Sequence, residues 1–356
     1  MGDLELRFLR DHGQPASQTI DALCTHLERA TKTAEIAIYD CHFETPEGER
    51  VGTTLQALRD RGVAVRIVDH DDRKVKREMP IPPPPTPPAE YIDTLGLNVH
   101  PVTAFATLMH HKYAVVDGRY LWTGSMNWSQ DSFTRQDNVI AVLESPEVCA
   151  DYQRDFEQLW EKQDNENTGN FDCEWRELTF AGQSIRVRPF FCPGRGPKLA
   201  AEIASQIKAA TTRIRIASPV LTSGPILGAL GDVVGKDPTH VRGLVDRTQM
   251  LSVLRQWKTQ QGGSWKPEAF RYIANSCAFS GKSSVPWGPT TLHDFMHAKM
   301  TVCDDITFVG SYNSSRSGEE NAENVLMIDG KAVADVVAGV IDELIATYAL
   351  KPGEGW

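Results

Sequence analysis

Apolar and polar residues in the first half of the chain follow two spacings, one typical of strands and the other of helices. Residues 4–9 and 34–39 have the alternation of a strand with one buried face. Residues 17–29 place Ile20 and Leu27 on one face of an amphipathic helix. In order, the pattern predicts a strand at 4–9, a helix at 17–29, a strand at 34–39, a helix through Leu55 and Leu58, and a strand at 63–69.

The second half of the chain repeats this order of elements. It predicts a strand at 184–190, a helix at 198–209, and strands at 213–217 and 241–246. Strands that alternate with helices predict an α/β fold whose sheets carry helices on their faces. A polar stretch rich in Asn, Asp and Gly separates the two halves. We therefore expect an N-terminal lobe at 1–165, a linker at 166–182 and a C-terminal lobe at 183–356.

One motif occurs once in each half, with the same internal spacing. It consists of His-x-Lys, four further residues, Asp, and then Gly-Ser-x-Asn. The same 187 positions separate the two histidines, the two lysines and the two aspartates. A long match in register at domain spacing indicates a repeated site, whereas a single His-x-Lys triplet would not. The members are His110, Lys112, Asp117, Ser125 and Asn127 in the first copy, and His297, Lys299, Asp304, Ser311 and Asn313 in the second.

This paired motif resembles that of the phospholipase D superfamily, whose hallmark is the histidine–lysine–aspartate signature. The resemblance covers nearly the whole chain, and both copies are complete. It implies a bilobed α/β fold with pseudo-two-fold symmetry and an active site at the interface of the lobes, so an obligate dimer is unnecessary. It also implies a two-step phosphodiesterase that uses a phosphohistidine and no metal ion. In similar enzymes the N-terminal motif usually supplies the nucleophile, which would be His110, with His297 as the acid.

The residues of the motif suit an anion such as a phosphate. Residues two apart in a strand point to the same face, so each motif histidine shares a face with its lysine. Two imidazoles and two ammonium groups would then surround one cavity. Because histidine titrates at about pH 6.5, one imidazole can be neutral and the other protonated at neutral pH. The neutral one attacks phosphorus, and the protonated one donates a proton to the leaving oxygen. The sequence itself does not order the two. Neutral donors for the substrate are expected from Ser125, Asn127, Ser311 and Asn313.

Two carboxylates follow the motifs at equal distances. Asp137 follows Asn127 by ten residues, and Glu323 follows Asn313 by ten. A carboxylate that accepts from the second ring nitrogen of a histidine fixes its tautomer, and similar superfamily members use one in this way. We expect this role for both, although Asp137 is one methylene shorter than the usual Glu; the alternative is a solvated or helix-capping carboxylate. The aspartates of the motif itself are expected to hold the turn after each strand.

Residues beside the motifs have competing interpretations. His111 faces away from His110 and is expected to pack in the interior. Trp122 and Trp128 flank the first Gly-Ser turn, and we expect core packing for them ahead of stacking on a base. His293 and Asp294 fit a cavity wall and a loop equally well.

Two segments before the motifs are expected to carry substrate selection, because loops on a rigid scaffold usually do. The first contains the basic run at 73–77 and a proline-rich stretch at 79–88, which is expected to be extended and stiff. The basic run fits a solvated helix face about as well as a rim that follows phosphates. The second segment, 262–289, is rich in glycine and contains two tryptophans.

Length, charge and cysteine usage limit the class of protein and its cellular compartment. At 356 residues the chain has room for two lobes with ample core. The net charge of −10 works against indiscriminate nucleic-acid binding but does not exclude a locally positive groove. No apolar run reaches the roughly 18 residues of a membrane span, and no signal peptide is evident. Seven scattered cysteines without a Cys-x-x-Cys pair fit a reducing cytosol, so we expect a cytoplasmic protein without disulfides or a zinc cluster.

The sequence does not decide the substrate. We expect a nuclease or nucleotide phosphodiesterase first, because of the cytosolic character, the small size and the basic run. Phospholipase D-type hydrolysis or head-group transfer on a phospholipid is the alternative, since the same motif serves it equally well. A non-catalytic phosphate-binding subunit is the least expected. No cofactor or metal ion is expected, because two lysines and two histidines already supply positive charge. The oligomeric state stays open.

Overall fold

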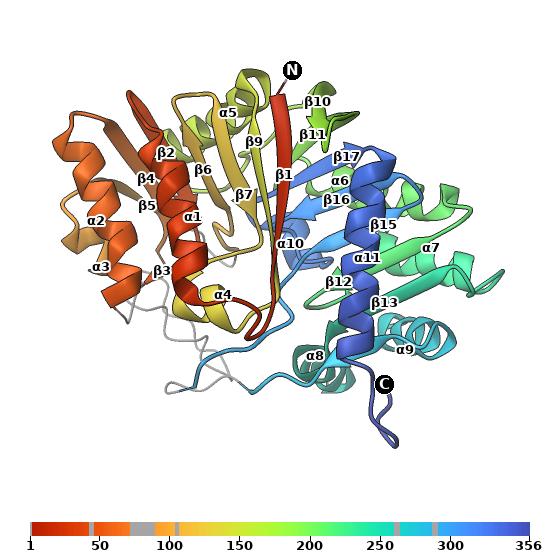
Figure 1. Cartoon of the computed structure of the whole chain (residues 1–356). Helices are drawn as coiled ribbons and strands as arrows, with labels where there is room; N and C mark the ends of the chain where they lie inside the picture. Colours follow the sequence, from red (N-terminus) through yellow and green to blue (C-terminus); the bar gives the residue numbers. More distant parts are fainter. Residues whose placement is uncertain (1, 43–45, 72–89, 104–106, 260–263, 287–290) are drawn as a thin grey trace.

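The structure is a computed structural model that describes residues 2–42, 46–71, 90–103, 107–259, 264–286 and 291–356. It contains two similar α/β halves that lie side by side, with the first half on the left and the second on the right in Figure 1. The N-terminus lies at the top of the seam between them, and the C-terminus lies beneath the second half. This arrangement confirms the predicted bilobed α/β fold.

The first half contains nine strands and five helices within the described residues. The strands are β1 (Gly2–Leu9), β2 (Thr33–Ile38), β3 (Cys41–His42), β4 (Ala64–His70), β5 (Asn98–Val102), β6 (Lys112–Val116), β7 (Tyr120–Gly124), β8 (Trp128–Ser129) and β9 (Asn138–Glu144). The helices are α1 (Ala16–Glu28), α2 (Pro46–Asp60), α3 (Glu90–Thr94), α4 (Gln130–Thr134) and α5 (Pro146–Lys162).

The second half contains eight strands and six helices within the described residues. The strands are β10 (Arg176–Phe180), β11 (Gln183–Cys192), β12 (Ile214–Ser218), β13 (Val241–Asp246), β14 (Ser280–Lys282), β15 (Met300–Cys303), β16 (Ile306–Gly310) and β17 (Glu323–Asp329). The helices are α6 (Gly196–Ala209), α7 (Gly224–Val234), α8 (Arg247–Thr259), α9 (Lys266–Ser276), α10 (Arg316–Glu320) and α11 (Lys331–Thr347). The strands and helices predicted from hydrophobic spacing all correspond to elements of the structure, with ends that differ by a few residues.

One continuous sheet carries the internal symmetry. Its strand order is β14-β13-β12-β15-β16-β17-β11-β10-β1-β9-β7-β6-β2-β4-β5. The first seven strands mirror the last seven, so β11 corresponds to β1, β17 to β9 and β15 to β6. The halves join where β1 pairs in parallel with β10, with Gly2 opposite Leu178. Strand β10 lies within the segment predicted as a linker and forms a hairpin with β11.

Both halves contribute to one central core. It includes Tyr113 and Val139 from the first half and Val302 and Leu326 from the second, all at most 2% exposed. Helices α5 and α11, which follow the equivalent strands β9 and β17, also bury apolar faces in this core. Two further cores lie under α1 and α2 in the first half and under α6, α7 and α9 in the second. Such continuous burial holds the halves together at the seam where the motifs lie.

Within the described ranges, no helix has both the length and the apolar composition needed to cross a bilayer. All seven cysteines are free thiols.

Candidate active site

The two motifs meet at the seam between the halves. His110 lies just before β6, and its backbone N–H donates to the carbonyl of Ala322 in the other half at 2.8 Å. His297 lies just before β15, and its N–H donates to the carbonyl of Asp137 at 3.0 Å. The two backbone hydrogen bonds are equivalent. They hold His110 against the start of β17 and His297 against the start of β9.

The side chain of His110 is oriented by a carboxylate from the opposite half. Its Nδ1 lies 2.9 and 2.8 Å from the two oxygens of Glu323, which is fully buried. Because an ionised carboxylate can only accept, this geometry assigns the proton of His110 to Nδ1 and leaves Nε2 with its lone pair. The structure therefore brings together Glu323 and His110, across 213 positions of sequence.

The equivalent expectation for Asp137 is wrong. Nδ1 of His297 instead lies 3.1 Å from the amide oxygen of Asn138, the next residue along the chain. The carboxylate of Asp137 accepts from the ammonium of Lys282 at 2.9 Å and from the phenol of Tyr348. Asp137 thus belongs to a buried charge cluster behind the site and has no side-chain contact with the histidine.

A one-residue difference between the two halves explains this correction. Gly124 on β7 pairs with Ile140, whereas its counterpart Gly310 on β16 pairs with Val325. The first connection is therefore one residue longer, which makes Asn138 the structural counterpart of Glu323. Asp137 corresponds to Ala322, as their equivalent backbone bonds to the histidines show. Equal spacing in sequence consequently aligned the wrong residue.

The two lysines of the motifs are buried beside the histidines. The ammonium of Lys112 donates to the carbonyl of His110 at 2.5 Å, and that of Lys299 donates to the carbonyl of His297 at 2.6 Å. Their side chains are at most 4% exposed. The charges of both lysines act on each histidine. All four side chains therefore share one site.

The serines of the Gly-Ser turns lie behind the site, which corrects their expected role as substrate ligands. Ser125 donates to the amide oxygen of Asn138 at 2.7 Å, and Ser311 donates to the carboxylate of Glu323 at 2.5 Å. Both serines are fully buried. They fix the residue that orients each histidine.

The asparagines of the motif are placed differently from the serines. The side-chain oxygens of Asn127 and Asn313 are buried and have no hydrogen-bond partner among the described residues. Buried polar atoms are normally paired, and unpaired ones mark sites that meet a ligand. The symmetry of the two positions supports their prediction as polar groups that line the site.

The aspartates of the motif hold turns outside the site, as expected from the sequence. Asp117 accepts from the backbone N–H groups of residues 31–33, just before β2. Asp304 makes the same contacts with residues 211–213, before β12. Burial raises the pKa of Asp117, but the hydroxyl of Thr31 and the backbone donors outweigh it and lower this pKa to about 2. Each aspartate thus ties its motif strand to the neighbouring strand.

The electrostatics of the site follow from burial combined with positive charge. Burial, followed by the charges of Lys112 and Lys299, lowers the pKa of His110 well below its usual value, so its imidazole is neutral. Burial and the same lysines lower the pKa of His297. Burial lowers the pKa of Lys112 to about 7 and raises that of Glu323 to about 7. These groups are poised to exchange protons near neutral pH when an anion enters.

Three functional candidates of the structure are absent from the site predicted from the sequence. Asn138 has no motif signal, because its role depends on strand register. His111 is fully buried, as expected, but it lies in a polar chain: its Nε2 is 3.1 Å from the carboxylate of Asp155, and Asn324 donates to its Nδ1 at 3.0 Å. Tyr39 packs its ring edge-on against His110, with centroids 4.8 Å apart. Each of these contacts joins separate segments of the chain.

The remaining candidates beside the motifs have structural roles. Trp122 and Trp128 are buried in the core of the first half. His293 stacks on Phe295, and Asp294 accepts from a backbone N–H of the same loop. The basic run at 73–77 and the proline-rich stretch at 79–88 lie outside the described residues, as do parts of the segment 262–289.

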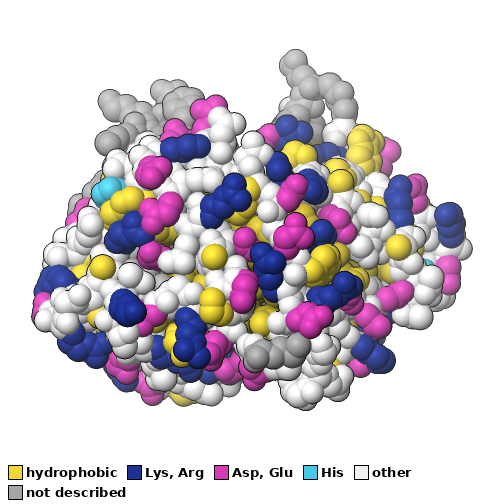
Figure 2. Space-filling model, turned by 90° about the horizontal axis from the view of Figure 1, so that it is seen from above, with side chains coloured by type: hydrophobic (Ala, Val, Ile, Leu, Met, Phe, Trp, Pro, Cys, Tyr) yellow, Lys and Arg dark blue, Asp and Glu magenta, His cyan; other side chains and the backbone are white. Residues whose placement is uncertain are grey.

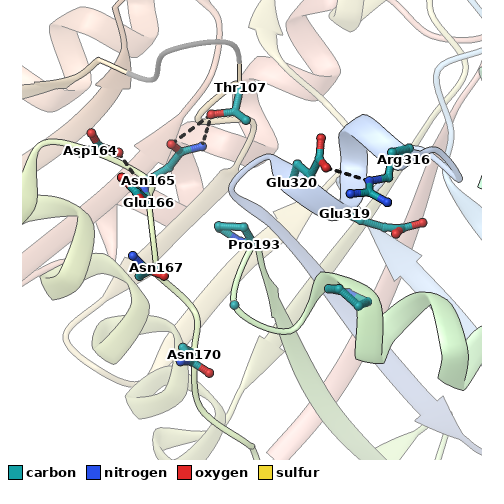
Figure 3. Close-up of a pocket in the computed structure, with 12 residues that line it drawn as sticks. Thr107, Asp164, Asn165, Glu166, Asn167, Asn170, Pro193, Arg316, Glu319 and Glu320 are labelled. Atoms are coloured by element: carbon teal, nitrogen blue, oxygen red, sulfur yellow. Dashed lines mark hydrogen bonds and ion pairs between the residues drawn. The ribbon is translucent and has the colours of Figure 1, made fainter.

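A separate pocket of about 590 Å³ opens beside the first motif (Figure 3). Its walls come from the segment 163–170, the turn before α6, and α10. Asn165 and Thr107 are hydrogen-bonded on one side, and Arg316 pairs with Glu320 on the other. The pocket includes none of the motif residues, and its carboxylates and amides differ from the cationic site. Across the described part of the chain, no three His, Cys, Asp or Glu side chains are grouped to hold a metal ion.

Comparisons with known proteins agree with this geometry. A family model described as "Cardiolipin synthase, PLD-like domain" matches residues 23–160 and 203–345, one segment in each half. The chain is 29% identical over 136 residues to a mitochondrial cardiolipin hydrolase from Chlamydomonas reinhardtii and 31% identical over 145 residues to one from Danio rerio. These matches cover 38% and 41% of this chain. The chain spans only 55% and 58% of the length of those relatives.

A solved structure matches the whole arrangement. It is the phosphatidylserine synthase of Haemophilus influenzae, which superposes with a TM-score of 0.65 over 96% of this chain and 86% of that one, at 12% identity. Agreement at this low identity concerns the fold alone, and it extends over both halves.

Proposed function

The chain belongs to the phospholipase D superfamily, and from this premise we propose that it is a phosphodiester hydrolase that works through a phosphohistidine without a metal ion. The observation that carries the proposal is the convergence of two histidine–lysine pairs at one seam. Each histidine is held at Nδ1 by a residue of the other half, and both lysines are buried. Such a site offers two nucleophilic or acidic nitrogens and two cations to one phosphate.

The different partners of the two histidines support a division of roles. A carboxylate beside His110 stabilises the positive charge that its ring gains when Nε2 attacks phosphorus. An amide beside His297 gives an imidazolium less stabilisation, so that ring is the better proton donor. We therefore assign His110 as the nucleophile and His297 as the acid.

The reaction then proceeds in two balanced steps. His297 takes up a proton from solvent as the anionic substrate enters and offsets the charges of the two lysines. Nε2 of His110 forms a bond to phosphorus while the bond to the leaving oxygen breaks, and His297 protonates that oxygen. His297, now neutral, takes a proton from water, whose oxygen attacks phosphorus and releases His110. Lys112 and Lys299 stabilise the charge on the non-bridging oxygens in both steps. Asn127 and Asn313 line the site as neutral polar groups.

Two classes of substrate fit this chemistry. A nucleic acid or nucleotide is the first class predicted from the sequence, although the basic run that favours it lies outside the described residues. Figure 2 shows the face at the N-terminal end of β1, where basic and acidic side chains are interspersed. Asn138 meets His297 at the opposite end of this strand, beside Leu9, so this face does not bear on the choice of substrate.

A phospholipid is the second candidate, and two observations favour it. The curated relatives bear the name cardiolipin hydrolase. Val285 and Leu292, in the segment that leads from β14 into the second motif, are both 41% exposed. Apolar side chains exposed beside an active site suit a lipid surface better than a nucleic acid. The predicted cytoplasmic location stays a prediction, since the relatives are named as mitochondrial.

An activity panel tests the proposal. Single-stranded DNA, duplex DNA, RNA, and vesicles of cardiolipin or phosphatidylcholine should be offered in the presence of a chelator. We expect cleavage of one class, and loss of several orders of magnitude in His110→Ala and His297→Ala. His240→Ala is the matched control, because His240 lies at a distant ion pair with Asp237. Near-normal activity of either motif variant on the true substrate would contradict the shared site.

A further inference from the structure

Tyr39 lies directly against the first histidine–lysine pair. It is the first residue after β2, and its backbone N–H donates to the carbonyl of His111 at 2.9 Å. Its ring meets the imidazole of His110 at an interplanar angle of 63°, with centroids 4.8 Å apart. The ammonium of Lys112 lies 4.8 Å from the centroid of the same ring. One side chain therefore contacts both functional groups of the first motif.

Among the described residues, the second motif has no such aromatic cover. Pro219 is the first residue after β12, as Tyr39 is after β2, so it occupies the equivalent place. Over the described ranges, no aromatic ring packs on His297 or faces the ammonium of Lys299. The aromatic contact thus occurs on the histidine that has the carboxylate partner, which is the one assigned as the nucleophile.

The contacts have two physical consequences. Glu323 holds His110 at Nδ1, and a ring packed on its side adds a second constraint, so the direction of Nε2 is set. The negative face of an aromatic ring also favours a nearby ammonium over a neutral amine. Lys112 is 1% exposed, and burial lowers its pKa to about 7. Its charge is therefore sensitive to each neighbour.

The other charged groups around Lys112 act in both directions. Glu323 on β17 and Asp40 after β2 favour its protonated form. Lys299, at the start of the equivalent strand, is close enough for the two ammonium groups to repel. The carbonyl of His110 accepts one of its protons. The ring of Tyr39 is uncharged, and its π face stabilises the ammonium form of Lys112.

We propose that Tyr39 is a positioning residue of the reaction: it fixes the ring of His110 for attack and keeps Lys112 protonated beside the phosphate. This role rests on the proposed function and adds a residue that the motif does not contain.

The test compares Tyr39→Leu, which removes the ring, with Tyr39→Phe, which keeps it. The matched control is Tyr120→Leu, because Tyr120 also carries a cation over its ring, Arg29 at 4.9 Å, but lies away from the site. For each folded variant, kcat/KM on an activated phosphodiester and the affinity for sulfate are measured across neutral pH. Sulfate is chosen because its charge is constant over this range, so its binding reports the protein alone.

In Tyr39→Leu the alkaline limb of both profiles should move down by about half to one and a half pH units, because the ammonium loses its cation–π partner. kcat/KM should fall about ten- to a hundredfold through misorientation of His110. kcat/KM of Tyr39→Phe should stay within about threefold of the wild-type value. Tyr120→Leu should match the wild type in both pH profiles.

Unshifted limbs in a folded Tyr39→Leu variant, even with reduced activity or melting temperature, would overturn the proposal and leave Tyr39 as a packing residue. If Tyr39→Leu does not fold, Tyr39→Met supplies a long side chain without a ring, and the same outcomes apply. If the wild type cleaves no phosphodiester, but the alkaline limb of sulfate binding still moves in Tyr39→Leu, the proposed function is refuted and the contact with Lys112 is supported.

Discussion

Replacement of Glu323 by glutamine tests how the site activates its nucleophile. The substitution keeps the shape of a fully buried side chain and one acceptor for Nδ1 of His110, but it removes the negative charge. As Nε2 bonds to phosphorus, the ring of His110 becomes positive, and the wild-type carboxylate stabilises it. Glu323→Gln should therefore slow the first chemical step and leave the fold intact.

The magnitude follows from the geometry. Opposite unit charges about 4 Å apart interact by about 4 kcal/mol at an effective dielectric constant of about 20. If about half of the ring's charge has developed in the transition state, the loss is about 2 kcal/mol, which corresponds to about 30-fold in kcat/KM.

The pH profile gives a second measure of the same effect. Burial raises the pKa of Glu323 to about 7, and only the ionised form stabilises the ring, so wild-type kcat/KM should rise as the pH increases through this value. Burial lowers the pKa of Lys112 to about 7, and only its ammonium form stabilises the phosphate, so kcat/KM should fall again at higher pH. The wild type should show a narrow bell, and Glu323→Gln should lose the acid limb assigned to this carboxylate.

The assay is steady-state hydrolysis of the best substrate from the panel, with chelator, across neutral pH. Glu319→Gln is the control, since Glu319 is also buried, at 7% exposure, but accepts from Ser223 outside the site. A Glu323→Gln variant within about twofold of the wild type, with its acid limb unchanged, would refute the reasoning.

Three further predictions follow from the same site. An activated phosphodiester needs little acid assistance, so His297→Asn should accumulate acid-labile phosphate from it on the peptide that contains His110. In the wild type, label on the peptide that contains His297 would reverse the roles of the two histidines. Turnover should be unchanged by a chelator, and activity that vanishes and returns with added magnesium would contradict metal independence. Lys282→Met should destabilise the protein by about 3–5 kcal/mol in urea unfolding, because it leaves the carboxylate of Asp137 buried with its cation removed. A loss below about 1 kcal/mol would show that this ion pair contributes little.

The strands, the helices and the histidines and lysines of the site could be predicted from the sequence alone. Hydrophobic spacing is a local consequence of one buried face, so it can be read without knowledge of the partner element. The repeated motif likewise placed His110, Lys112, His297 and Lys299 together, because a repeat at domain spacing implies two equivalent halves. The turn role of the motif aspartates also followed from their place directly after a strand.

The residue that orients each histidine could not be predicted in this way, because it depends on the register between strands. Asp137 and Glu323 have equal spacing from their motifs in the sequence, yet the connection between β7 and β9 is one residue longer than the connection between β16 and β17. A shift of one residue in a strand turns every side chain to the other face. It therefore places Asn138 on His297 and turns Asp137 toward Lys282 from the other half.

The same reason applies to the serines and to Tyr39. Whether Ser125 and Ser311 face a substrate or a buried partner depends on how β7 and β16 pair with their neighbours, and the pairing places both behind the site. Tyr39 reaches His110 only because β2 and β6 are adjacent in the sheet, although 71 positions separate the two residues in the chain. Contacts between distant segments are fixed by strand order and register, and these are set by the burial of whole faces, which local sequence spacing does not encode.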